Sequence, residues 1–184
     1  RVALVDVFLG VEQLPEDIDA LFTVEDKDQR RSVSEREPDL EELRRLRPGK
    51  RLVGPGVLEI CEHADMAFLA LHGGNGENGQ LQATLDMYGI PYTGSRVLAS
   101  AVAMDKCATK RFLQAAGIST AASMILLRRE SRNLEEIKTR ILATFGLPVV
   151  IKAASQGSSI GVTIAKAEAE KANKAKSEFL SSTS

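Results

Sequence analysis

The sequence has little cysteine, no excess of charge of one sign and no long apolar run, and each absence excludes a class of function. Cys61 and Cys107 have no CxxC spacing and no nearby histidine pair, so neither a disulfide framework nor a zinc site is indicated. The balance of 24 basic against 25 acidic side chains gives no attraction to nucleic acid or to an anionic membrane. No run approaches the roughly 20 apolar residues of a membrane-spanning helix, and no signal-peptide pattern is present. We therefore expect small molecules or copies of the chain as partners, in a reducing cytoplasm.

At 184 residues, with 43% hydrophobic and 27% charged side chains, the chain has the composition of an ordinary globular protein. Two short apolar runs, 2–9 and 64–71, are typical of strands buried on both faces of a parallel sheet. The second run leads into a glycine-rich loop at 72–79, a helical pattern at 81–88 and a short extended segment at 90–94. This order predicts a βαβ unit of a doubly wound sheet.

Three residues stand where a helix N-cap is expected: Asp39, Asp105 and Asn133. Asp105 predicts a helix over 106–116, and Asn133 with Glu136 has the spacing of a capping box. After this last helix the sequence predicts strands at 149–152 and 161–165, joined by a loop of small residues, and then a helix over 166–179. The two strands are interpreted as a hairpin with a flexible tip.

The tip of this hairpin combines one cation with very small side chains. Lys152 ends the first strand, and glycine and serine at 157–161 allow a ligand to approach the backbone closely. Successive N–H groups and hydroxyls in such a loop suit phosphate oxygens. A flexible turn beside a surface lysine explains the same residues, and the loop alone leaves both interpretations open.

The loop at 72–79 has four glycines, one histidine and one acid, and it follows a predicted parallel strand. Open α/β sheets bind ligands at the carboxyl ends of their strands, which favours this loop as part of a site. His72 could donate a hydrogen bond to a carboxylate, although a single histidine is more often structural. Glu77 could orient a neighbouring group or cap the helix that follows.

The most specific signal is three segments in a fixed order: 72–95 (HGGNGENGQLQATLDMYGIPYTGS), 99–118 (ASAVAMDKCATKRFLQAAGI) and 146–162 (GLPVVIKAASQGSSIGV). Together they resemble the D-alanine-D-alanine ligase family of the ATP-grasp superfamily. The resemblance implies an α/β fold with a Rossmann-like (pre-ATP-grasp), substrate-binding N-terminal domain over 1–103. The small central subdomain of an ATP-grasp domain is expected to follow over 104–184. It also implies that both domains are incomplete, lacking the first strand and most of the C-terminal ATP-binding domain, so that this stretch alone is not expected to be active.

The resemblance implies an ATP-dependent carboxylate-amine ligase of peptidoglycan precursor synthesis. ATP phosphorylates the carboxylate of one D-alanine, and the amine of a second then attacks the acyl phosphate. The implied cofactors are ATP and Mg²⁺, with the metal ligands outside this stretch, and the implied partners are D-alanine, ATP and a second copy bound through the N-terminal domain.

The same resemblance implies roles for individual residues. Lys106 and Lys152 would contact nucleotide phosphate. Gly157, Ser158 and Ser159 would form the closing loop, and Ser158 would also serve catalysis. His72 would lie near the first D-alanine. Gln156 and Ala153 stand where the family more often has glutamate and proline.

Two alternatives stay open at this level. One is a related ligase that makes D-alanyl-D-lactate or D-alanyl-D-serine, because the acceptor-selecting residues would lie outside this stretch. The other is a non-catalytic remnant that binds nucleotide or a partner protein.

Overall fold

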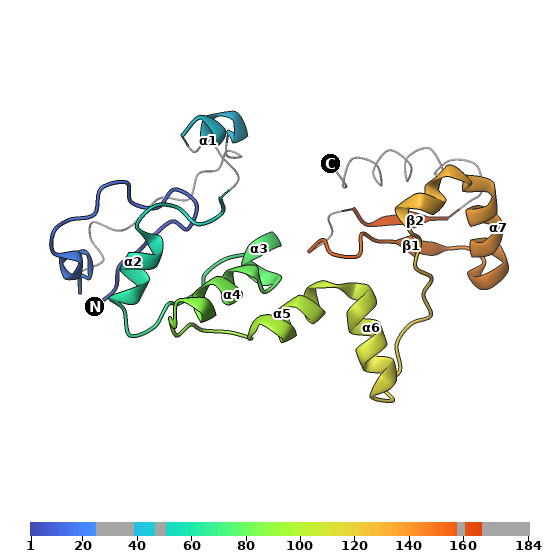
Figure 1. The fold of residues 1–184 in the computed structure, drawn as a ribbon. Coiled ribbons are helices and arrows are strands. Elements are labelled where there is room, and N and C mark those ends of the chain that lie inside the picture. The colour runs from blue at the N-terminus through green and yellow to red at the C-terminus, as the bar shows by residue number, and fades with distance from the viewer. Residues whose placement is uncertain (25–38, 47–50, 158–160, 167–184) are drawn as a thin grey trace. The chain divides into compact units, whose positions relative to one another are not determined.

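The computed structural model describes residues 1–24, 39–46, 51–157 and 161–166 (Figure 1). These residues divide into two compact units, which are considered separately below. Unit 1 comprises Arg1–Ala70 and Leu81–Ser95, and unit 2 comprises Leu71–Gln80 and Arg96–Ser184. The domain boundary expected at 103–104 stays a prediction.

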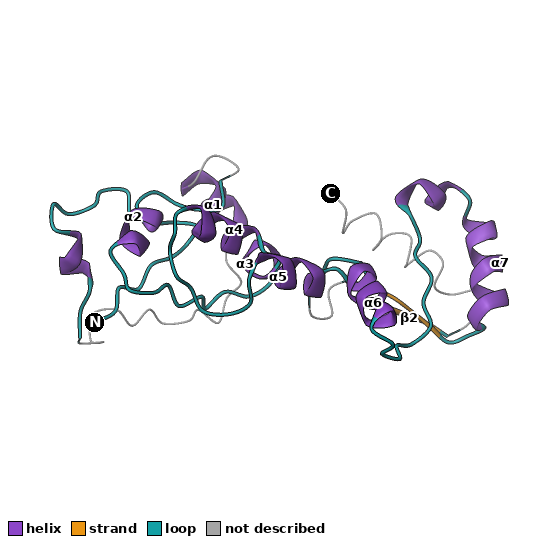
Figure 2. Ribbon diagram, turned by 60° about the horizontal axis from the view of Figure 1, so that its bottom comes forward, coloured by secondary structure: helices purple, strands orange, loops and turns teal. Residues whose placement is uncertain are grey.

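The described elements are mostly short helices, and two strands form the sheet seen in Figure 2. The 3-10 helices are η1 (Ile18–Leu21) and η3 (Arg128–Arg132), and the α-helices are α1 (Leu40–Leu46), α2 (Val57–Glu62), α3 (Gly74–Glu77), α4 (Gln80–Met87), α5 (Val97–Met104), α6 (Lys106–Ala115) and α7 (Leu134–Phe145). The strands are β1 (Val149–Ile151) and β2 (Thr163–Ala165). None of the helices in the described ranges is long and apolar enough to cross a membrane.

The core of unit 1 is small and is formed by side chains of α2, of α4 and of the segment after α4. Its buried apolar side chains are Val57, Ile60, Leu81, Leu85 and Ile90. The spacing of three residues in α2 and four in α4 places each pair on one side of its helix. The helix expected at 81–88 is thereby confirmed as α4.

The strand predicted over 2–9 is wrong. Val2 forms an isolated antiparallel bridge with Thr23, and the chain then turns. The carboxylate of Asp6 accepts hydrogen bonds from the N–H groups of Phe8 and Leu9, at 2.9 and 2.8 Å. A side chain that bonds its own backbone in this way offers the chain an alternative to a sheet ladder, and here that alternative prevails over the apolar pattern.

The second predicted strand, at 64–71, is reduced to a single bridge. Ala67 pairs with Tyr92 in the parallel sense, with hydrogen bonds from Ala67 N–H to Pro91 O (2.8 Å) and from Thr93 N–H to Ala67 O (3.0 Å). The order of strand, helix and parallel partner is as predicted, but the full strand length is wrong. In the described residues no further strand lies beside this bridge to extend it.

Unit 2 confirms two of the predicted helix N-caps, Asp105 and Asn133, and the hairpin. The Asp105 carboxylate accepts from Cys107 N–H and Ala108 N–H at 2.8 and 2.9 Å, so α6 begins at the residue after it. β1 and β2 pair antiparallel with Val150 opposite Ile164. The helix expected over 166–179 lies outside the described residues from position 167 on.

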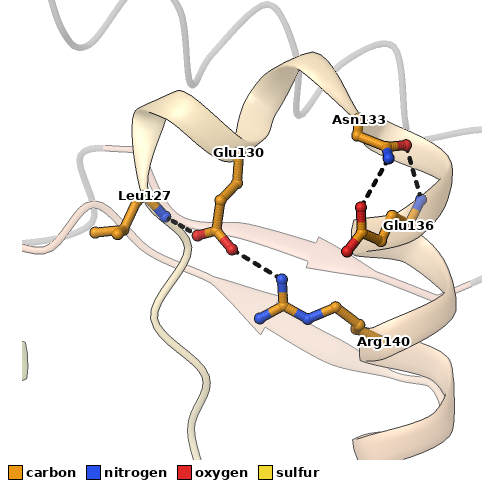
Figure 3. Close-up of polar contacts among 5 residues, drawn as sticks. All are labelled: Leu127, Glu130, Asn133, Glu136 and Arg140. Carbon is orange, nitrogen blue, oxygen red and sulfur yellow. Dashed lines mark hydrogen bonds and ion pairs between the residues drawn. The ribbon is translucent and has the colours of Figure 1, made fainter.

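The connection into α7 is held by polar contacts (Figure 3). Asn133 accepts from Glu136 N–H (3.3 Å), which confirms it as the N-cap of α7, and its side-chain amide donates to the Glu136 carboxylate (2.7 Å). The reciprocal half of a capping box is not formed, because the backbone N–H of Asn133 donates to Glu130 O instead. Glu130 accepts from Leu127 N–H at 2.7 Å and from the Arg140 guanidinium at 2.8 Å. The hydrogen bond from Arg140 holds the pKa of the Glu130 carboxyl below its ordinary value.

Candidate functional site

The candidate site lies in unit 2, where the N-terminus of α6 meets the loop that follows β1. The Asp105 cap makes Lys106 the first residue of α6. Its backbone N–H donates to Ala154 O at 2.9 Å, and its ammonium donates to Gln156 O at 2.6 Å. A lysine 50 positions upstream is therefore bound at two points to the predicted phosphate loop.

A cation at this end of a helix is placed against the helix dipole, which favours negative charge at the N-terminus. The first free N–H groups of α6 are already used by Asp105. An anion at this position would consequently be held by the Lys106 ammonium more than by the helix end itself. An ammonium has three N–H donors, and the bond to Gln156 O uses one of them.

The hairpin presents an exposed apolar pair beside Lys152. Val150 and Ile164 face each other across the two strands and remain 54% and 46% exposed. Lys152 comes two residues after Val150, the spacing that places side chains on the same face of an extended chain, and it too is exposed. An apolar surface next to a cation suits a flat base attached to phosphates.

The predicted closing loop is described up to Gly157, and Ser158 and Ser159 lie outside the described residues. Gly157 does not adopt the left-handed conformation. Among described atoms, a Cβ placed there would have only Glu77 Oε2 within 4 Å, at 3.8 Å. The two glycine-rich loops of the sequence therefore approach each other at this point.

In the loop at 72–79, backbone conformation and close packing explain why glycine is present. Gly73 and Gly74 have φ of 73° and 47°, and a Cβ on Gly79 would lie 2.7 Å from the Val97 carbonyl oxygen. The first N–H of α4 is accepted by the Asn78 side chain at 3.0 Å. Sequence reasoning considered Glu77 for this capping role and missed Asn78, although asparagine two residues before a helix is an informative signal.

His72 and Lys152 are exposed, and within the described part of the chain neither forms a hydrogen bond or ion pair with Lys106, Gln156 or Glu77. The structure therefore places the Lys106 ammonium at the start of the loop and the Glu77 carboxylate near Gly157. The described residues include no group of three histidine, cysteine or acidic side chains that could hold a metal ion.

Comparison with known proteins gives matches to both parts of one family. The D-ala D-ala ligase N-terminus matches residues 12–95, and the D-ala D-ala ligase C-terminus matches residues 112–182. The chain belongs to the D-alanine-D-alanine ligase family. The predicted family and the α/β fold class are both confirmed.

Two curated family relatives illustrate the match. A D-alanine-D-alanine ligase from Pelotomaculum thermopropionicum is 47% identical over 124 residues, covering 65% of this chain and 39% of the relative. One from Pediococcus pentosaceus is 39% identical over 183 residues, covering 96% of this chain and 49% of the relative. The chain thus spans about half or less of the length of the relatives it matches.

Solved structures of the family agree with the fold. The D-alanine-D-alanine ligase from Bacillus anthracis complexed with ATP has a TM-score of 0.55 at 35% identity, over 68% of this chain and 38% of its own. The VanG D-Ala:D-Ser ligase from Enterococcus faecalis has a TM-score of 0.56 at 32% identity, over 71% of this chain and 34% of its own.

Proposed function

We propose that this chain is part of an ATP-dependent ligase that joins two D-alanines through an acyl phosphate. The observation that carries the proposal is the Lys106 ammonium, 2.6 Å from Gln156 O at the start of the small-residue loop. The relatives named as D-alanine-D-alanine ligases and the ATP complex of one structural neighbour support the same activity.

The chemistry asks for charge neutralisation and positioning. A carboxylate oxygen of the first D-alanine attacks the γ-phosphorus of ATP, and the bond to ADP breaks. The amine of the second D-alanine then attacks the carbonyl carbon, phosphate leaves with its oxygen, and the amine loses a proton. Neither step needs a nucleophilic side chain, and both gain from cations placed at the transferred phosphoryl group.

The described residues provide parts suited to the nucleotide. Lys106 and Lys152 supply positive charge for the phosphates, Gly157 leaves its backbone open, and the exposed Val150 and Ile164 side chains offer an apolar surface for a base. We assign Ser158 and Ser159 to the same loop, with Ser158 near the reacting groups, and His72 to the first D-alanine.

Mg²⁺ belongs to this proposal as the ion that accompanies ATP. The described residues do not form a site for it, since they include no cluster of three metal-ligating side chains. We therefore assign no step of the reaction to a metal held by this part of the chain.

We further propose that the reaction serves peptidoglycan precursor synthesis in the cytoplasm and that the protein associates as a homodimer through its N-terminal domain. ATP and free D-alanine are the substrates that this assignment requires. Sedimentation of the purified protein, with and without residues 1–95, tests the dimer, and a monomer at micromolar concentration in both cases contradicts it.

The direct test is phosphate release from ATP by the protein expressed from its whole reading frame. With D-alanine present, we expect release of phosphate and formation of the dipeptide, detected by mass spectrometry. A ligase of known activity, assayed in parallel, controls for conditions. Absence of both products while the control is active would reject the proposed function.

A second candidate is a D-alanine-D-serine ligase, favoured by the structural likeness to the VanG enzyme. The two activities differ only in the nucleophile that attacks the acyl phosphate. Offering D-alanine with equimolar D-serine and D-lactate, and measuring the ratio of products, separates them. D-alanyl-D-serine as the predominant product would select the second candidate.

A further inference from the structure

Lys106 makes a contact that phosphate binding alone does not require. Its two donors, the backbone N–H and the ammonium, reach Ala154 O and Gln156 O, two residues apart in the same loop. The two contacts thus attach the start of the small-residue loop to α6.

The bond from the ammonium is short and partly buried, and it joins a charged donor to a backbone carbonyl. Hydrogen bonds from charged donors are the stronger ones in proteins. The position of the cation at the start of α6 is unfavourable for the helix, so the contact with the carbonyl also offsets that cost.

We propose that Lys106 is a positioning residue that tethers the start of the phosphate loop to α6 in the nucleotide-free protein. This inference rests on the proposed function. The Lys106 side chain orders residues 154–156 before nucleotide binds, and the two remaining N–H donors of its ammonium are then available to phosphate. A loop ordered before binding loses less conformational freedom when the ligand arrives.

The same helix provides a matched control. One turn further on, Lys110 donates through its ammonium to Ala121 O, in the segment between α6 and η3. Both lysines therefore bind a backbone carbonyl outside their helix, but only Lys106 reaches the loop. Lys106→Met and Lys110→Met both remove one positive charge from α6 and keep a long unbranched side chain.

The test is amide hydrogen exchange of the 184-residue chain without nucleotide, followed by mass spectrometry. The backbone amide of residue 106 donates to Ala154 O, so its exchange reports whether the loop stays attached to α6. In Lys106→Met we expect this amide, after correction for its intrinsic rate, to exchange about 2- to 10-fold faster, the range that corresponds to one lost hydrogen bond. Lys110→Met should leave its exchange unchanged. Lys106→Arg keeps a long cationic donor and should restore most of the protection.

Unchanged exchange of the residue 106 amide in Lys106→Met would overturn the tether, as would equal acceleration in Lys110→Met. Circular dichroism verifies folding, and if Lys106→Met does not fold, a comparison of Lys106→Arg with Lys106→Gln decides the question by the same criterion. A Mg-ATP titration of the wild-type chain is read separately. Faster exchange in Lys106→Met together with no Mg-ATP binding by the wild type would support the tether and count against the proposed function. Mg-ATP binding by the wild type together with unchanged exchange in Lys106→Met would support the proposed function and count against the tether.

Discussion

The two glycine-rich loops of unit 2 contain glycine for different physical reasons. In the loop at 72–79, Gly73, Gly74 and Gly79 all have positive φ, and Gly79 is packed against the backbone of Val97. At Gly157 the backbone is in an ordinary region, and the nearest described atom to a Cβ would be 3.8 Å away. The first loop needs glycine in order to fold.

The absence of a structural demand at Gly157 is informative. Glycine adopts positive φ at little steric cost, and because it has no Cβ it also leaves the backbone accessible to a ligand. Among the described atoms only Glu77 Oε2 lies within 4 Å of a Cβ placed at Gly157, so the described residues do not require glycine there. The proposed phosphate site offers a reason for the small residue. Glycine content alone would have given the two loops equal weight.

The largest effect that tests this comparison is expected from Gly79→Ala. The added Cβ would lie 2.7 Å from the Val97 oxygen at a φ of 91°, so both clash and strain oppose it. We expect the free energy of unfolding to fall by about 2–4 kcal/mol, measured by urea denaturation.

Gly73→Ala is the matched control for this change. Its φ of 73° with a ψ of 173° also favours glycine, but a Cβ there would meet no described atom within 4 Å. Only the conformational cost remains, about 1–3 kcal/mol. Equal losses of unfolding free energy in Gly79→Ala and Gly73→Ala would mean that the contact with Val97 does not add to the need for glycine at position 79.

The sequence predicted those features of the fold that depend on neighbours along the chain. Asp105 and Asn133 were correctly identified as caps because each bonds N–H groups two or three residues away. The turn at Asp6 was missed because an apolar run was given more weight than a local side-chain bond. α5 was missed as well, since its N-cap residue, Arg96, makes no side-chain capping bond that would mark the start.

For the candidate site, sequence reasoning selected residues but not their contacts. Lys106 and Gly157 were both named, yet no local rule links Lys106 to Gln156, 50 positions along the chain. The approach of Glu77 to Gly157 likewise depends on how α3, α5 and α6 pack. Such contacts arise from tertiary structure, which periodicity and spacing do not encode.

Lys152→Ala tests whether the hairpin loop is a phosphate site. Because Lys152 is exposed, we expect stability to change by less than about 0.5 kcal/mol. Loss of one charged contact to phosphate should weaken Mg-ATP binding roughly 10- to 100-fold, measured as the loss of the thermal shift.

Lys166→Ala is the control for Lys152→Ala. Lys166 is also exposed, but it follows the Val149–Ala165 pair, at the opposite end of the hairpin from the loop. It should leave nucleotide binding unchanged. A similar loss in both variants would point to a general electrostatic effect and would contradict a defined site.

Gly157→Ala tests whether glycine at this position is needed for ligand binding or for folding. The space around Gly157 accepts a methyl group, so stability should be unchanged or slightly raised. A phosphate that approaches this backbone would meet the methyl, and we expect the Kd for Mg-ATP to rise about tenfold, or about 1.4 kcal/mol. Calorimetric titration measures this change, and unaltered affinity in a folded variant would remove the ligand explanation for Gly157.

The smallest effect concerns pH, and it involves a part of unit 2 that is held by its own polar contacts. The hydrogen bond from Arg140 lowers the pKa of Glu130, so the folded state favours the ionised carboxylate. Its contribution is therefore fully present above the ordinary carboxyl pKa and is lost as pH falls through the lowered value in the folded state. Glu130 and Arg140 are both partly exposed to solvent, which keeps the effect small.

Thermal unfolding of Glu130→Gln should show a weaker decline in Tm over this acid range than the wild type, whereas Gly157→Ala should follow the wild-type profile. Identical profiles for wild type and Glu130→Gln would mean that the Arg140 contact does not stabilise the connection to α7, and a changed profile in Gly157→Ala would mean that the hairpin loop contributes to the fold after all.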